Sequence, residues 1–77
     1  MTATQTVITR LIKNYLRDSG ITQKALAADL GMTQPTLSRK LTGIRMWSLD
    51  DLDRLIQIGV PIGLDTFGAA IREEYTK

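Results

Sequence analysis

The sequence TQKALAADLGMTQPTLSRKLTGIR, residues 22–45, contains two short amphipathic segments separated by a glycine. In the first segment, Leu26 and Leu30 are four residues apart and therefore share one face of a helix. Leu37 and Leu41 repeat that spacing in the second segment. Gly31 lies between the segments, where it can adopt the left-handed conformation that ends a helix. The stretch predicts two helices joined by a tight turn, over about residues 22–42.

The sequence also predicts where these two helices begin and end. Thr22 and Thr33 each precede a predicted helix and can cap it through the side-chain hydroxyl. Pro35 falls in the first turn of the second helix, where a missing N–H costs little. Gly43 ends that helix. With the leucines directed inward, the outer surface holds donors, acceptors and two cations but no carboxylate: Gln34, Pro35, Thr36, Ser38, Arg39 and Lys40. Such a face suits the major groove of DNA.

An amphipathic helix is predicted before this pair, over about residues 6–18, because two adjacent apolar rows recur there at intervals of four residues. The rows are Val7, Leu11, Tyr15 and Ile8, Ile12, Leu16. Residues 1–6 are polar and are expected to form a frayed arm. Trp47 follows the pair, and we expect it to fill the core between helices. A dimer contact and a DNA contact are the other interpretations of this residue.

Two further helices are predicted after Trp47. Ser48 and Asp51 form a capping box at the start of a helix over about residues 49–58, ended by Gly59 and Pro61. We expect its apolar residues Leu49, Leu52, Leu55 and Ile56 to point inward. The aspartates at 50, 51 and 53 suit the positive end of the helix dipole, and a divalent-metal site is the alternative. The last helix, about 65–74, carries Leu64, Phe67, Ile71 and Tyr75 at helical spacing, which either close the core or meet a second copy.

The amino-acid composition restricts the classes of function that the chain is expected to have. With 77 residues and neither cysteine nor histidine, the chain is expected to be one small domain without disulfide, cofactor or metal site. No nucleophile has a base partner and no glycine-rich phosphate loop occurs, so an enzyme is not expected. No apolar run has the length of a membrane helix and no signal peptide is recognisable, which favours the cytoplasm. There is no room for an effector-binding domain, so no small-molecule effector is expected.

Charge is distributed unevenly along the chain. Residues 1–47 carry seven basic and two acidic side chains, a net +5, whereas residues 48–77 carry three basic and six acidic ones, a net −3. The half with the helix pair is therefore the basic half, as expected for a domain that binds a polyanion. A chance imbalance on a solvated surface is the alternative explanation.

The helix pair resembles the helix-turn-helix of the phage Cro and lambda-repressor-like (XRE-type) regulators, from about Val7 to Val60. The resemblance is carried by Gln23, Ala27, Gly31, the Thr33-x-x-Thr36-Leu37-Ser38-Arg39 run and Leu41-x-Gly43. It implies an all-α, five-helix domain that binds double-stranded DNA in a sequence-specific manner to control transcription. It also implies that Gln23 bonds a phosphate and braces Gln34.

Roles for the other residues follow from the resemblance and from base chemistry. Gln34 suits adenine and Arg39 suits guanine, while Pro35 offers only apolar contact. Thr36 and Ser38 can contact a base or a phosphate. Lys40, Thr42 and Arg45 are expected to contact the DNA backbone. A phage or prophage repressor that covers a promoter is the expected function, bound as a homodimer or as a monomer. The alternative is a protein-interaction module, such as the antitoxin of a toxin–antitoxin pair.

Overall fold

The computed structural model describes residues 2–76, and within that range the side chains of all residues except 64–67, 74 and 76. The described chain contains five helices and no strand: α1 (Ala3–Ser19), α2 (Gln23–Asp29), α3 (Gln34–Leu41), α4 (Leu49–Gln57) and α5 (Leu64–Thr76). The predicted all-α, five-helix fold is confirmed.

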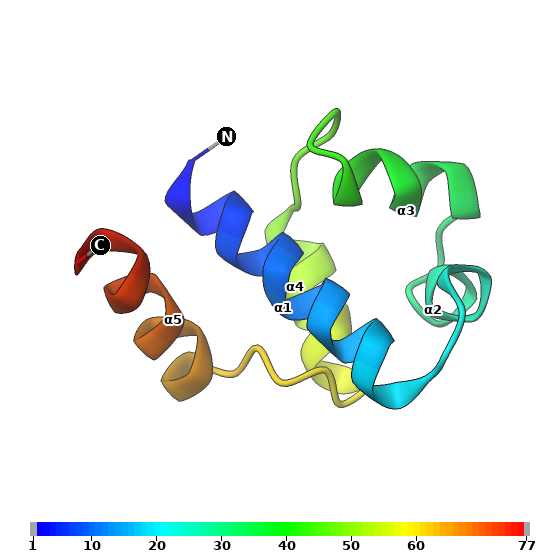
Figure 1. The fold of residues 1–77 in the computed structure, drawn as a ribbon. Helices are drawn as coiled ribbons and strands as arrows, with labels where there is room; N and C mark the ends of the chain where they lie inside the picture. Colours follow the sequence, from blue (N-terminus) through cyan, green and yellow to red (C-terminus); the bar gives the residue numbers. More distant parts are fainter. Residues whose placement is uncertain (1, 77) are drawn as a thin grey trace.

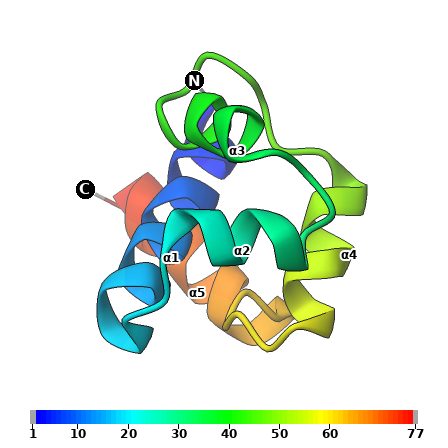
Figure 2. The same cartoon turned by 90° about the vertical axis from the view of Figure 1, so that its right-hand side faces the viewer.

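Helix α1 lies in the middle of the molecule (Figure 1). Helix α5 packs against one side of α1, while α2 and α3 pack against each other on the opposite side. Seen from that side, α2 crosses in front of α1, α3 lies above it, and α4 stands beside both (Figure 2). The arrangement leaves the outer surface of α3 uncovered by any other helix.

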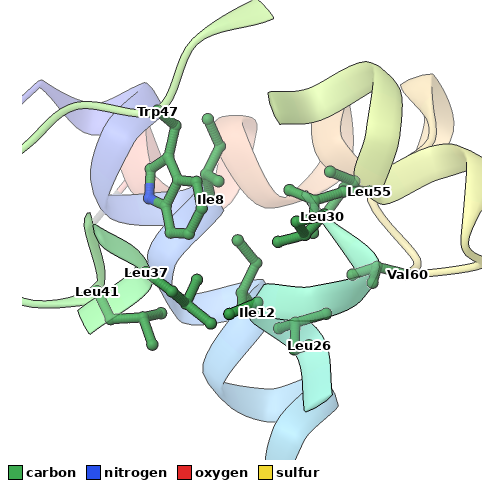
Figure 3. Packing of buried hydrophobic residues seen from close by; sticks show 11 residues of the cluster. Ile8, Ile12, Leu26, Leu30, Leu37, Leu41, Trp47, Leu55 and Val60 are labelled. Carbon is green, nitrogen blue, oxygen red and sulfur yellow. The ribbon is translucent and has the colours of Figure 1, made fainter. Parts of the chain in front are cut away.

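The core is built where α1, α2, α3 and the chain from Trp47 onward converge (Figure 3). Leu26, Leu30 and Leu37 are fully buried, and Leu41 and Trp47 are each 5% exposed. Burial of a side chain of this size contributes roughly 1.5–3 kcal/mol relative to its exposed state. The predicted inward leucines and the core position of Trp47 are therefore confirmed, and they fix α3 on the rest of the domain.

The N-terminal segment differs from the prediction. Helix α1 begins at Ala3, so residues 3–6 are helical and the predicted frayed arm is wrong for them. The Thr2 hydroxyl caps the helix by accepting a hydrogen bond from the Gln5 N–H at 3.3 Å. The Gln5 side chain is buried, with its amide bonded to the main chain of Trp47. Because Trp47 is 42 residues away, periodicity within the helix did not reveal this anchor.

Helix α4 is rotated relative to the prediction. Asp51 and Leu55, four residues apart, face the interior, and Leu52 is half-buried. Leu49 and Ile56, seven residues apart, share the opposite face and are 83% and 51% exposed. Their predicted inward orientation is wrong. The reason is that Asp51 is held inside by hydrogen bonds, which turns the other side of the helix to solvent.

Helix α5 was predicted over residues 65–74 and spans Leu64–Thr76. Its predicted apolar row is only partly described, because the side chains of Leu64 and Phe67 lie outside the described set. Ala70 is buried and Ile71 half-buried, whereas Tyr75 is 72% exposed. The described part of this helix therefore contributes small and medium side chains to its contact with α1.

Candidate nucleic-acid interface

The turn between α2 and α3 is fixed by backbone hydrogen bonds around Gly31. Gly31 has φ +70°, in the left-handed region that favours glycine. Its N–H donates to the Ala28 carbonyl at 3.1 Å, and the Met32 N–H donates to the Ala27 carbonyl at 3.0 Å. These bonds satisfy carbonyls at the end of α2 that would otherwise lack partners. The predicted role of Gly31 is confirmed.

Arg54 of α4 holds this turn from outside. Its Nη1 donates to the Leu30 carbonyl at 2.7 Å, across 24 residues of sequence. A Cβ atom added at Gly31 would lie 2.7 Å from the same nitrogen. The absence of a side chain at Gly31 therefore permits both the left-handed turn and the Arg54 contact at the junction of α2 and α3.

Gly31→Ala is expected to destabilise the domain by the roughly 1–2 kcal/mol typical of left-handed strain, plus the cost of displacing the Arg54 guanidinium from the Leu30 carbonyl. Gly20→Ala is the matched control, since Gly20 has φ +75°, close to that of Gly31, and its added Cβ would meet nothing within 4 Å. Urea unfolding followed by circular dichroism measures both variants. Equal losses in the two variants would show that Arg54 adds nothing at this turn.

The start of α3 is set by a threonine and a proline. The Thr33 hydroxyl accepts a hydrogen bond from the Thr36 N–H at 3.3 Å and donates to the Thr36 hydroxyl at 2.9 Å. Pro35 occupies the second position of the helix, where its missing N–H is not needed. The predicted Thr33 cap is confirmed. With Leu37 and Leu41 buried behind it, the first turn is held in one orientation.

The predicted DNA-contacting residues gather on and beside the free face of α3. Arg39 lies midway between Leu37 and Leu41 in sequence and therefore points away from the core. Thr36 and Ser38 are half-buried at the edges of that face. The remaining predicted residues, apart from Lys40, are exposed: Gln23, Gln34, Pro35, Arg39, Thr42 and Arg45. No hydrogen bond joins the side chains of Gln23 and Gln34 within the described structure, so the brace implied by the resemblance stays a prediction.

Several of the bonds that close the end of α3 converge on the Arg39 carbonyl. The Arg39 carbonyl accepts from the Thr42 hydroxyl at 3.1 Å, from the Ile44 N–H at 2.9 Å and from the Arg45 N–H at 3.2 Å. Gly43, with φ +86°, makes this reversal possible. The Thr42 hydroxyl proton is used inside the domain, so a phosphate contact from this group would have to break the bond to Arg39.

Lys40 differs from the other predicted residues because its ammonium group faces the protein. It forms an ion pair with the Asp51 carboxylate, and both side chains are only about a tenth exposed, at 11% and 10%. The same ammonium lies 5.8 Å from the centre of the Trp47 ring, within reach of a cation–π interaction. Asp51 also completes the predicted capping box with Ser48. Lys40 therefore joins α3 to α4, a role that the sequence did not reveal.

Burial would raise the pKa of Asp51, but hydrogen bonds from Lys40 and Ser48 and the charge of Lys40 outweigh it and hold that pKa below its ordinary value. A carboxylate whose pKa is depressed by folding contributes stability above its unfolded pKa, about 3.9. That stability is lost as the pH falls through the lower, folded value.

We therefore expect the free energy of unfolding to fall less steeply between about pH 5 and pH 2 in Asp51→Asn than in the wild type. Urea titrations at several pH values measure this dependence. Asp50→Asn is the control, because it removes an exposed carboxylate from the same turn and leaves the Lys40–Asp51 ion pair in place. An unchanged acid limb in Asp51→Asn would exclude the ion pair as its source.

Two buried polar residues of α1 hold the loop that follows α3. The Trp47 N–H donates to Gln5 Oε1 at 2.6 Å, and Gln5 Nε2 donates to the Trp47 carbonyl at 3.1 Å. The indole Nε1 donates to the Thr9 hydroxyl at 2.9 Å. Thr2 and Gln5 match the Thr-x-x-Gln spacing of a helix start, from which the beginning of α1 was predictable but the bonds of Gln5 to Trp47 were not.

The outer surface of α3 is thus a polar face with cations and without carboxylates, and the helix behind it is held at its start, at its end and on its buried side. The described residues include no group of three or more potential metal ligands, and Asp51 is engaged in the capping box. None of the described helices is long and apolar enough to span a bilayer.

The chain matches the helix-turn-helix family over residues 12–58, which is more than half of its length and includes α2, the turn and α3. No curated protein and no solved structure matched the chain in the corresponding comparisons. The family match and the geometry of α2 and α3 agree in position and type. The chain therefore belongs to the helix-turn-helix family, and is an XRE-type DNA-binding transcription regulator.

Proposed function

We propose that this protein is a sequence-specific repressor of the phage Cro or immunity-repressor kind, which acts by occupying a promoter. The observation that carries the proposal is the outer face of α3. It presents Gln34, Pro35 and Arg39 to solvent, has no carboxylate, and stands on a helix fixed at both ends. A rigid helix with such side chains can enter the major groove and read base edges.

The side chains divide into readers and anchors. Arg39 can form two hydrogen bonds with guanine O6 and N7, and Gln34 can do the same with adenine N6 and N7. Pro35 can pack on a thymine methyl group. Thr36 and Ser38, at the edges of the face, suit contacts to a base or a neighbouring phosphate. Gln23 and Arg45, both exposed at the borders of the helix pair, suit phosphates on either side of the groove.

Two of the residues predicted to contact the DNA backbone are given different roles in this proposal. Lys40 is left out of the proposed DNA-contacting set, because moving its ammonium to a phosphate would leave the Asp51 carboxylate enclosed and unpaired. Thr42 is kept as a minor contact, since its hydroxyl must first leave the Arg39 carbonyl. Phosphate binding is therefore assigned mainly to Gln23 and Arg45.

One copy of α3, eight residues long, spans only a few base pairs. A second copy would double the sequence that is read, with half-sites about one helical turn apart. This consideration supports a homodimer on an inverted repeat.

The experiment is selection of bound duplexes from a random DNA pool at physiological salt. Enrichment of an inverted repeat is the expected result, and it would also supply the operator. Binding that lacks any sequence preference and fades with increasing salt would contradict the repressor proposal. If the protein instead co-purifies with one stoichiometric protein partner and enriches no DNA, it is a protein-interaction module such as an antitoxin.

A further inference from the structure

An apolar patch lies immediately beyond the C-terminal end of α3. Among the described side chains, the large apolar residues left exposed are Ile44, Met46, Leu49, Ile56 and Tyr75. Three of the five fall within the six residues 44–49, at exposed fractions of 75%, 65% and 83%. Ile56 shares the outward face of α4 with Leu49. We name Ile44, Met46, Leu49 and Ile56 the α3–α4 patch.

This clustering calls for an explanation, whereas single exposed apolar residues do not. The domain does not need these side chains for its own packing, because Trp47 and Leu55, their neighbours in sequence, already fill the core. Rotation of α4 by the Asp51 hydrogen bonds places Leu49 and Ile56 on the surface. Exposed apolar side chains gathered on a loop and on the helix that follows it are a feature of interaction surfaces.

We propose that the α3–α4 patch is the surface through which two copies of this chain pair. The inference rests on the proposed function, in that two copies are needed to read an operator. It goes beyond that function by naming the surface. A second copy fits for two reasons, which are the charge on the rim and the position next to α3.

The rim of the patch carries both signs of charge. Arg45 lies between Ile44 and Met46, and Asp50 and Asp53 flank Leu49 on α4, all three exposed. In a two-fold pairing the same surface meets itself, so the cation of one copy can approach a carboxylate of the other. A patch with charges of one sign would instead oppose self-association.

The position of the patch links pairing to DNA reading. The loop from Thr42 to Ser48 leaves the end of α3 and leads directly into α4 (Figures 1 and 2). Hydrogen bonds from Gln5 and Thr9 to Trp47 hold that loop in place. Two copies joined through it would hold their α3 helices at a fixed separation, and that separation sets the spacing of the half-sites.

The first test is sedimentation equilibrium of the free protein, without DNA, from micromolar to submillimolar concentration. We expect a monomer–dimer equilibrium in the wild type and at least a tenfold weaker dimer in Leu49→Glu. Leu49 is largely exposed, so the variant should fold, which circular dichroism checks. Tyr75→Ser is the matched control, since Tyr75 is also exposed but lies on α5, and its dimer should match the wild type.

The second test uses the absence of cysteine from the chain. Met46→Cys is expected to form a disulfide-linked dimer under mild oxidation, several-fold faster than the similarly exposed Tyr75→Cys. A wild type that stays monomeric throughout the concentration range, with equal cross-linking of both cysteine variants, would overturn the proposal. So would a dimer that Leu49→Glu leaves intact and Tyr75→Ser weakens, because pairing would then run through α5.

These outcomes are separate from those of the DNA selection. If the chain enriches an operator but pairs through another surface, the proposed role of the α3–α4 patch is excluded and the repressor proposal is kept. If the chain forms a dimer that depends on the patch but enriches no DNA sequence, the pairing surface is kept and the repressor proposal is excluded.

Discussion

Arg39→Ala is expected to weaken binding to the selected operator by roughly 1–3 kcal/mol, about 5- to 150-fold, and to relax the preference at one base-pair position of each half-site. Arg39 points directly away from the leucines that anchor α3, and it is exposed. Its truncation should leave the fold unchanged and remove one bidentate contact. Titration of the operator and of its single-position variants, at one fixed salt concentration, measures both effects.

Arg45→Ala is the control for a cation that binds phosphate without reading sequence. It should weaken operator and random duplexes by similar factors and reduce the salt dependence by about one unit per bound copy. The base-reading role of Arg39 fails if Arg39→Ala behaves in the same way. Because Arg45 also borders the α3–α4 patch, its comparison should be made on a single half-site, where pairing does not contribute.

Trp47→Ala should be the most destabilising of the substitutions considered, with a loss of about 3–5 kcal/mol in the free energy of unfolding. The indole ring is buried beside Ile8 (Figure 3) and its Nε1 is bonded to Thr9, so its removal leaves a cavity and an unpaired hydroxyl. The total free energy of unfolding of a small domain is only about 5–15 kcal/mol. Urea unfolding followed by circular dichroism measures the change, since the only tryptophan is lost.

Two variants separate packing from hydrogen bonding at this position. Trp47→Phe keeps most of the ring but loses the bond to Thr9, and should cost less than the alanine variant. Met46→Ala removes an adjacent side chain that is 65% exposed and should change stability by less than about 0.5 kcal/mol. A small effect of Trp47→Ala would mean that the ring is not a core anchor.

Local rules predicted most of the fold. The caps at Thr22, Thr33 and Ser48 and the stops at Gly31 and Gly59 each depend on a few neighbouring residues, and the structure confirms all five. The inward leucines of α2 and α3 also followed from spacing alone. These features were predictable because the hydrogen bonds and contacts that decide them lie within one or two turns.

The errors arose where a distant partner decides the structure. Gln5 was predicted to lie in a polar, frayed arm, but its side-chain amide is hydrogen-bonded to Trp47, 42 residues away. The ion pair of Lys40 with Asp51, 11 residues on, was also missed, while the predicted phosphate contact of Lys40 stays a prediction. Leu49 and Ile56 fit an inward row by spacing, but the buried Asp51 turns them outward. One-dimensional periodicity does not contain these pairings.

The two faces of α3 differ in how freely they can change. Leu37, Leu41 and Lys40 hold the helix against the core, Trp47 and Asp51. Gln34, Pro35 and Arg39 are exposed. Evolution or design can therefore exchange the outward residues for another set and retarget the protein to a new operator while stability is retained. A graft of these three side chains, with the inner face untouched, is a direct way to test whether specificity can be transplanted between scaffolds of this kind.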